Sequence, residues 1–182
     1  MAGISTKELT RLLLGDQQAQ CDQAPLQIVR AMPNMAAKIR EAVTLFTADL
    51  GTLSKDNLDI TSWIFNQVGS AQYVEESCFD IAAVLVGCGG SLLLLAVDGL
   101  LDAAVAEGLK RSEAQNMVVN SAIGLMKLVP AGDHPSVLRE KIASPGGCSI
   151  RALLELEKAG VRSAYTGAIM AAAEKSRNMS RS

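Results

Sequence analysis

The feature that most constrains the fold of this chain is a long run of residues without charge. From Ile81 to Val97 there is no Lys, Arg, Asp or Glu, and Asp80 and Asp98 bound the run on either side. Such a run has too few polar positions for a solvent-facing stripe, which indicates a helix that is buried on most sides. It is slightly short for crossing a bilayer and contains several glycines. We therefore expect it to lie in an interface between two subunits of a homodimer with intertwined helices, and not in a membrane.

The composition favours a mainly α protein. Of the 182 residues, 49% are hydrophobic but only 3% are aromatic, and aliphatic filling of this kind favours packed helices over a β-sandwich. The net charge of -2, without a long block of one sign, argues against a nucleic-acid partner. The N-terminus lacks the pattern of a signal peptide, so we expect a cytoplasmic protein.

The cysteines and the single histidine do not predict a metal site. The cysteines fit no C-x-x-C spacing, and His134 has no cysteine near it in the sequence. We expect reduced thiols and no bound metal. The four cysteines are Cys21, Cys78, Cys88 and Cys148.

The pattern of apolar residues and helix-stop signals predicts a short α/β segment followed by helices. We expect a helix over 6–14, strands over 26–32 and 43–48, and a helix over 56–68 capped by Ser54. A long helix is predicted over 78–107, ending near Gly108, with further helices over 113–129, 136–143, 149–158 and 161–176. We predict a domain boundary after residue 48, which separates an α/β remnant (1–48) from a helical domain (49–182).

Two glycine-containing turns are candidates for binding a small molecule. The first runs from Ser144 to Ser149 and leads into a helix, where paired glycines let the backbone approach a ligand and new amides point outward. An ordinary capped helix start is the alternative. Its substrate-binding candidates are Ser144, Pro145, Gly146, Gly147 and Cys148, and Ser149 is a candidate catalytic hydroxyl. The second turn is predicted at Gly87, Cys88, Gly89, Gly90 and Ser91, facing the first across the dimer.

Four acids near the charge-free run are candidates for proton chemistry: Glu76, Asp80, Asp98 and Asp102. A carboxyl in apolar surroundings has a raised pKa and can then act as a general acid near neutral pH. Asp98 is the strongest candidate, because apolar residues flank it on both sides in the sequence. The alternative for each acid is a solvated cap or an ion pair, and His134 is expected to pack at a helix start.

Several segments together resemble the C-terminal part of the pyrroline-5-carboxylate reductase family. They are Ile28–Asn34, Val74–Asp80 with Gly87–Gly89, His134–Lys141, Ser144–Ile150 and Glu157–Arg162. The resemblance covers essentially the whole chain and implies a helical dimerisation domain, with Met1–Ile4 near the end of a nucleotide-binding domain. Where the family has a Ser-Gly-Ser/Cys-Gly-Pro-Ala-aromatic segment at the start of the long helix, this chain has Val86-Gly87-Cys88-Gly89-Gly90-Ser91-Leu92, without the proline, the aromatic residue and one hydroxyl.

The chain shows no G-x-G-x-x-G that opens a helix after a strand, so we expect no nucleotide cofactor. Our first hypothesis is therefore a cofactor-independent enzyme that isomerises, rearranges or cyclises an apolar nitrogen-containing small molecule, with a buried acid as proton donor. One alternative is a reductase-like subunit whose nucleotide domain is supplied in trans. Another is a non-catalytic dimerisation module.

Overall fold

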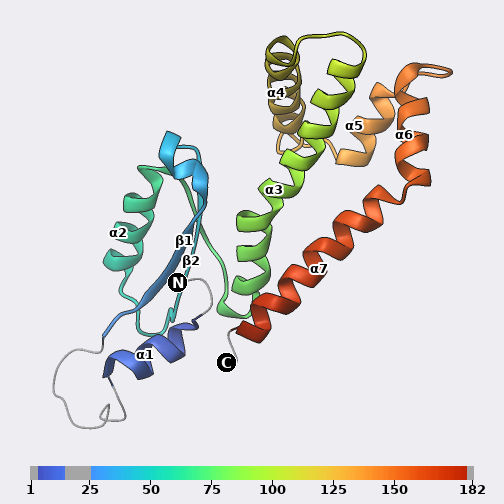
Figure 1. Ribbon diagram of the computed structural model, residues 1–182. Helices are drawn as coiled ribbons and strands as arrows, with labels where there is room; N and C mark the ends of the chain where they lie inside the picture. The colour runs from blue at the N-terminus through green and yellow to red at the C-terminus, as the bar shows by residue number, and fades with distance from the viewer. Residues whose placement is uncertain (1–3, 15–25, 180–182) are drawn as a thin grey trace. The chain divides into compact units, whose positions relative to one another are not determined.

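The structure of the protein is a computed structural model that describes residues 4–14 and 26–179. Packing divides the chain into two compact units, one made of Met1–Gly90 with Ala168–Ser182 and the other of Ser91–Gly167. Helices α3 (Glu76–Ala106) and α7 (Val161–Met179) contribute residues to both units (Figure 1). The predicted domain boundary after residue 48 stays a prediction. The division into two units is based on packing within the chain and does not test that boundary.

The first unit combines a small sheet with helices. In chain order it contains α1 (Thr6–Leu14), β1 (Val29–Pro33), the 3₁₀ helix η2 (Met35–Ile39), β2 (Ala42–Ala48), α2 (Lys55–Asn66), β3 (Gly69–Tyr73) and the start of α3. The strands lie in the order β1-β2-β3, with β1 antiparallel and β3 parallel to β2. Figure 1 shows α2 and the first half of α3 on opposite faces of this sheet.

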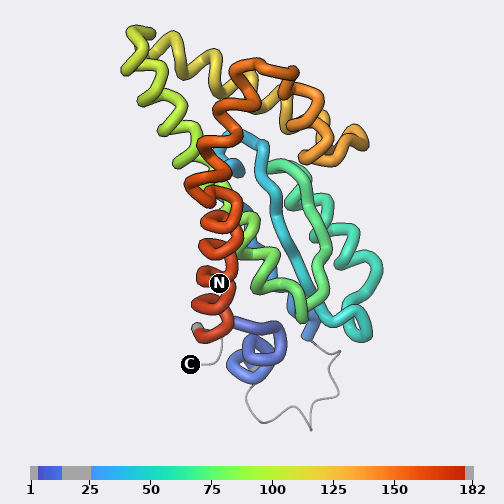
Figure 2. Tube along the Cα trace, turned by 90° about the vertical axis from the view of Figure 1, so that its right-hand side faces the viewer, coloured from blue at the N-terminus to red at the C-terminus, as the bar shows by residue number. Residues whose placement is uncertain are grey.

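The core of the first unit lies between β2 and the start of α3. Leu45, Phe79 and Ala83 form its buried centre, and Met32 and Val86 pack against them. Because both faces of β2 are covered, six of its seven residues are buried and the usual alternation of buried and exposed residues is lost. The last turns of α7 lie beside the start of α3 in both views (Figures 1 and 2).

Strand β3 begins at a position that only glycine can occupy. Gly69 has φ +148°, and a Cβ there would lie 2.1 Å from the carbonyl oxygen of Ala42 on β2. This close approach lets Gly69 pair with Ala42 at the start of the parallel ladder. The strand itself was not predicted, because Gly69–Tyr73 lacks the β-branched residues that mark strands.

The second unit is helical throughout. It consists of the later part of α3, α4 (Arg111–Leu128), α5 (Pro135–Ile142), α6 (Cys148–Lys158) and the start of α7. The Tyr165 hydroxyl of α7 donates to the carbonyl oxygen of Leu92 on α3, with 3.1 Å between the oxygens. Gly108 and Gly160 have positive φ values just after α3 and α6, which confirms them as helix stops.

The predicted mainly α fold with a short α/β segment is confirmed. Helix α1 covers the predicted range, and Ser54 caps α2, where its hydroxyl accepts from the amide of Asn57. The later helices lie within a few residues of their predicted ends. Helix α4 begins at Arg111, two residues before the predicted start at residue 113.

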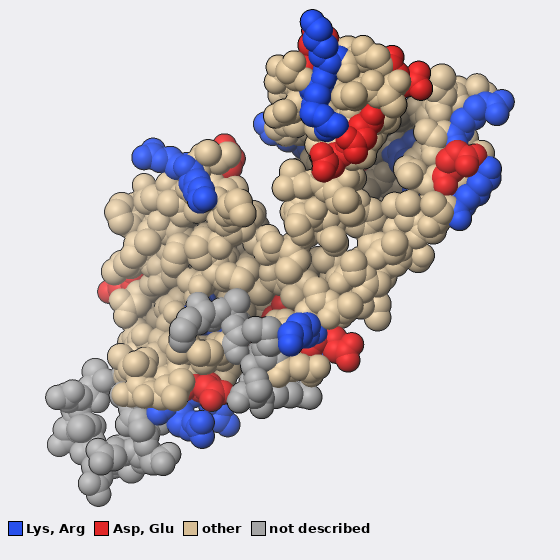
Figure 3. Space-filling model, in the orientation of Figure 1, with Lys and Arg blue, Asp and Glu red and all other residues tan. Residues whose placement is uncertain are grey.

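Helix α3 exposes most of its apolar surface within the single chain. It is long and apolar enough to cross a membrane by length and composition, and 11% of its most apolar window is buried. Leu93, Leu94 and Leu95 are all more than half exposed. In Figure 3 the surface along the middle of α3 is free of charged side chains, and charged side chains gather near the C-terminal part of the helix. The expected burial of this helix is therefore not provided by its own chain.

Candidate functional site

The segment between α5 and α6 forms the predicted turn into a helix. Gly146 adopts φ +71°, a left-handed conformation that suits glycine, and Gly147 is the N-cap of α6. The amide of Gly147 donates to the carbonyl oxygen of Ser144, with 3.0 Å between nitrogen and oxygen. A Cβ on Gly147 would lie 2.5 Å from the hydroxyl oxygen of Ser144, so a larger residue there would require the Ser144 side chain to rotate.

The N-terminus of α6 carries donors that its cap does not use. Gly147 has no side chain, and α6 therefore lacks a side-chain cap hydrogen bond. The first amides of a helix have no partner inside the helix, and together they attract an anion such as a carboxylate. Cys148 and Ser149 occupy the first two positions of the helix, with the Cys148 thiol exposed. The substrate-binding candidates from Ser144 to Cys148 thus belong to one turn, with Ser149 beside it.

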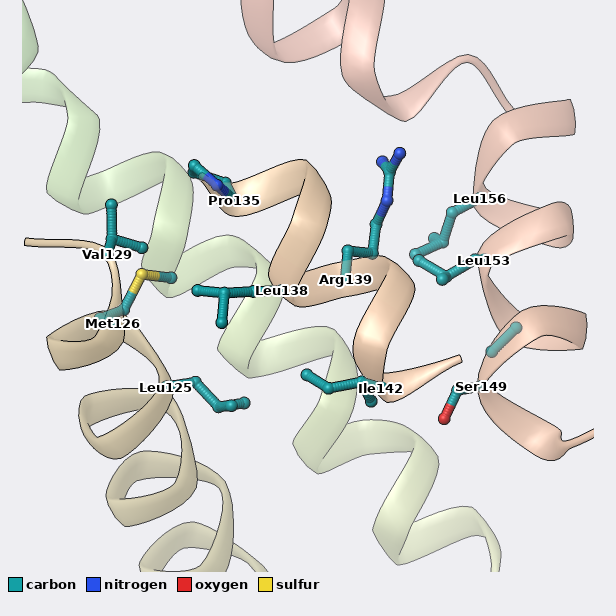
Figure 4. A pocket seen from close by; sticks show the side chains of 11 residues that line it. Leu125, Met126, Val129, Pro135, Leu138, Arg139, Ile142, Ser149, Leu153 and Leu156 are labelled. Carbon is teal, nitrogen blue, oxygen red and sulfur yellow. The ribbon is translucent and has the colours of Figure 1, made fainter. Parts of the chain in front are cut away.

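An apolar pocket of about 400 Å³ lies next to this turn. It is lined by α4, α5 and α6, and Figure 4 shows the side chains of Leu138 and Ile142 between those of the flanking helices. Ser149 supplies a hydroxyl, and the guanidinium of Arg139 points away from the apolar side chains (Figure 4). Sequence analysis missed this pocket, although Leu138 and Ile142 lie one helical turn apart and could have indicated an apolar face.

The second predicted turn is wrong. Residues 87–91 lie inside the uninterrupted helix α3, where backbone amides are bonded within the helix and cannot cradle a ligand as a turn does. A Cβ on Gly87 would lie 3.7 Å from the Cε atom of Met32, an ordinary contact distance, so packing at this position does not require glycine. No neighbouring heavy atom lies within 4 Å of a Cβ placed on Gly89 or on Gly90. Glycine costs only about 1 kcal/mol in a helix, which apolar packing of the flanking residues can offset.

The acids Glu76 and Asp80 share one arginine. The guanidinium of Arg30, on β1, donates to Glu76 Oε1 and to Asp80 Oδ1, each over 2.9 Å. Arg30 is only 4% exposed, and its guanidinium carbon lies 4.0 Å from the centre of the Phe79 ring. Sequence analysis did not single out Arg30 as a site residue, because its partners lie far along the chain.

The acids Asp98 and Asp102 lie at the surface of the second unit. Their side chains are 73% and 69% exposed, so the expected enclosure of Asp98 by apolar residues is not met within the chain. Successive residues of a helix point in different directions, and apolar neighbours in sequence therefore do not surround an acid. Both acids pair with Arg111, and the hydrogen bond that this guanidinium donates to Asp102 raises its pKa above the ordinary value.

His134 serves as the N-cap of α5, as expected for a residue at a helix start. Its Nδ1 atom accepts from the amide of Ser136 over 3.2 Å. The neighbouring Asp133 pairs with Lys141 over 2.9 Å. Among the described residues, no group of three or more His, Cys, Asp and Glu side chains could hold a metal ion. Cys21 lies outside the described residues.

Comparison with known proteins identifies the family. The fold and site define a helical dimerisation domain joined to a small three-stranded sheet. The family model described as pyrroline-5-carboxylate reductase dimerisation matches residues 76–179, more than half of the chain. The chain belongs to the pyrroline-5-carboxylate reductase family.

Individual relatives agree with this assignment. The chain is 38% identical to a pyrroline-5-carboxylate reductase of Neurospora crassa over 168 residues, covering 92% of this chain and 50% of the relative. A reductase of Lophium arboricola is 34% identical, covering 93% and 53%. The crystal structure of Plasmodium falciparum pyrroline carboxylate reductase with NADP bound matches with a TM-score of 0.86 at 28% identity, covering 98% of this chain and 68% of that one. The chain spans about half the length of the curated relatives it matches.

These relatives contradict the hypothesis of a cofactor-independent isomerase or cyclase. The Neurospora crassa and Lophium arboricola proteins are named as reductases, and the solved relative from Plasmodium falciparum has NADP bound. The hypothesis depended on a missing nucleotide-binding motif. Since the chain matches only about half of each curated relative, the absence of that motif from these residues does not indicate a different reaction.

The described residues do not themselves fit the NADP that the family implies. Two described connections lead from a strand into an α-helix, and an acid occupies each of them. In the β2–α2 connection the carboxylate of Asp49 accepts from the amide of Gly51 over 2.9 Å. In the β3–α3 connection Glu76 stands at the first position of the helix. Carboxylates at these positions would repel a pyrophosphate and compete for its donors.

Proposed function

We propose that the chain is the substrate-binding and dimerisation portion of a pyrroline-5-carboxylate reductase. The observation that carries this proposal is the turn from Ser144 to Gly147, which leads into the uncapped N-terminus of α6 within a chain that matches reductases over its whole length. The hydride donor would be held by a nucleotide-binding segment outside the described residues. This proposal develops the alternative hypothesis of a reductase-like subunit, for which the nucleotide domain was expected in trans.

In this proposal the turn holds the carboxylate of pyrroline-5-carboxylate. The amides at the start of α6 are oriented donors, and the macrodipole of the helix favours negative charge at that end. Tight closure of the turn by Gly146 and Gly147 lets a small ring come close to the backbone. The Ser149 hydroxyl is assigned to the ring nitrogen, where a donor would favour proton gain as the C=N bond is reduced.

The family match to a dimerisation domain supports a homodimer, and the exposed apolar surface of α3 supplies a surface for it. Leu93, Leu94 and Leu95 are exposed in the single chain, and covering them with a second copy would remove apolar surface from water. This assignment also accounts for α3 without a membrane. Asp98, Asp102 and Arg111 are then surface groups of the helical unit and not proton donors.

A growth experiment tests the proposed function. The nucleotide-binding half of the Neurospora crassa relative is fused to the N-terminus of this chain. This chain thus replaces the half of the relative that it matches, and the fusion protein is called the chimera. Reduction of the C=N bond of pyrroline-5-carboxylate gives proline. We expect the chimera, but not the 182-residue chain alone, to let bacteria that lack their own pyrroline-5-carboxylate reductase grow without proline.

The full-length Neurospora crassa reductase serves as the positive control for this growth test. Soluble chimera in the cell extract shows that the polypeptide was made and folded. Soluble chimera without growth, in cells where the control restores growth, would contradict the proposed function.

A further inference from the structure

The second unit has almost no buried core of its own. Of the ten hydrophobic residues that are buried in the described part of the chain, only Leu101 and Ala114 lie in this unit, all of whose residues are described. The other eight lie in the first unit and include Leu45 and Phe79. Because burial of apolar surface is the dominant favourable term in folding, the helices of the second unit need apolar contacts that one chain does not provide.

Within this unit, helix α3 is uncovered around much of its circumference. Successive residues of a helix are about 100° apart, so Leu93, Leu94 and Leu95 point in three different directions. These residues are 53%, 67% and 69% exposed. The start of α7 is bonded to α3 where Tyr165 donates to the carbonyl oxygen of Leu92, and it leaves the three leucines exposed. A partner that rests on one face of α3 would not cover all three, so the helix needs a groove that receives it.

The pocket between α4, α5 and α6 has the chemistry to receive such a helix. Its lining is apolar apart from Ser149 and Arg139, and the guanidinium of Arg139 points away from the apolar side chains (Figure 4). Ile142 and Leu156 line the pocket and are about half exposed, so its apolar wall is open to an occupant. A polar ligand would find few partners on this wall, whereas docking of leucine side chains removes apolar surface from water on both sides.

A second copy of this chain is the occupant that the observations favour. The leucines of α3 and the pocket belong to the same unit, and both lie within residues 76–179, which match the family model described as dimerisation. In a twofold dimer each surface is used twice, so one arrangement covers both leucine surfaces and both pockets. No neighbouring heavy atom lies within 4 Å of a Cβ placed on Gly99, one turn after Leu95, which leaves room for close approach of a second copy.

We propose that α3 of one copy inserts its leucines into the α4–α6 pocket of the other, and that the second unit therefore folds only in the dimer. The first unit, which has its own core, stays folded when the copies separate. The proposal rests on the dimer of the proposed function and specifies how its two copies meet. It does not depend on the reaction, so loss of this assembly and loss of reductase activity are separate results.

Photo-crosslinking of the 182-residue chain tests where α3 docks. A photoreactive phenylalanine replaces Leu94 in one variant and Leu95 in another, and mass spectrometry identifies the joined peptides. We expect a product of twice the mass of the chain, in which α3 of one copy is joined to residues 125–156 of the other. The same group at Ile60 on α2, outside the family match, is the control and should join no second copy. Covalent dimers joined only outside residues 125–156 would overturn the docking.

Hydrogen exchange of the same chain tests whether folding of the second unit depends on assembly. We expect Leu94→Glu to lower amide protection by about tenfold or more at residues 111–158, while residues 29–48 of the first unit keep theirs. Dilution of the wild-type chain should give the same pattern, because dimers dissociate at low concentration. Ile60→Glu is the matched control and should leave both segments as they are in the wild type.

Two results of the exchange experiment would overturn the proposal. Undiminished protection of residues 111–158 in monomeric Leu94→Glu would show that the second unit folds alone. Equal loss of protection in both units would show that the first unit is not independently stable. The growth test of the chimera is read separately, because a chimera that forms this dimer without restoring growth counts against the proposed function alone.

Discussion

At the scale of single residues, we expect the proposed substrate turn to depend on Ser149 more than on any acid. Ser149 is the second residue of α6 and the hydroxyl of the adjoining pocket. In the chimera we expect Ser149→Ala to lower kcat/KM by about a hundredfold, the usual effect of removing one hydrogen-bond donor to developing charge. Ser149→Thr keeps the hydroxyl and should retain most of the activity. Equal activity of the alanine variant and the wild type, in a steady-state assay, would remove Ser149 from the proposed site.

Phe79 is the residue on which the first unit depends most for its stability. It is 0% exposed, packs with Leu45 and Ala83, and lies beneath the guanidinium of Arg30. We expect Phe79→Ala to lower the free energy of unfolding by about 3–5 kcal/mol, measured by urea denaturation at one fixed protein concentration. Trp63→Ala removes an aromatic side chain that is 65% exposed and should have a much smaller effect. Similar losses in both variants would contradict the described core.

Residues that act over long sequence distances were beyond sequence analysis. The partners of Arg30 lie 46 and 50 positions away, and no local pattern indicates that they meet. The turn from Ser144 to Gly147 could be predicted because glycine, proline and a following helix are local signals. The apolar residues on either side of Asp98 in the sequence suggested that its carboxyl group is buried. The direction of a side chain, however, depends on its position around the helix.

At the scale of elements, the helices were predicted well and the sheet only in part. Helix α1 covers its predicted range, α2 follows its cap Ser54, and β2 follows its apolar run. Strand β3 escaped prediction because its pairing with β2 depends on Gly69, whose close approach to Ala42 is a tertiary contact. The glycines at 87, 89 and 90 suggested a turn, but the apolar residues around them continue α3 as a helix.

The exposed apolar surface of α3 makes a prediction about assembly. We expect Leu94→Glu to shift the chain from dimer to monomer, because it places a charge on a surface that a second copy would cover. Light scattering after size-exclusion chromatography measures this change. Ile60→Glu on α2 is the matched control, since Ile60 is also more than half exposed but lies outside the family match. Loss of the dimer in the control alone would place the interface elsewhere.

At the scale of the whole molecule, the chain combines a small three-stranded sheet with a helical dimerisation domain. The family could be predicted from the sequence because several motifs occur in the family's order along the entire chain. The reaction was predicted wrongly because a motif missing from this chain was taken as evidence about the chemistry. Relatives about twice as long show that these residues correspond to only part of a reductase.

The most direct test of this account is a steady-state assay of the purified chimera with NADPH and pyrroline-5-carboxylate. We predict that NADPH is consumed and proline is formed in equal amounts, whereas the 182-residue chain alone consumes no NADPH. Conversion of pyrroline-5-carboxylate without NADPH, or a folded chimera that makes no proline, would contradict the account.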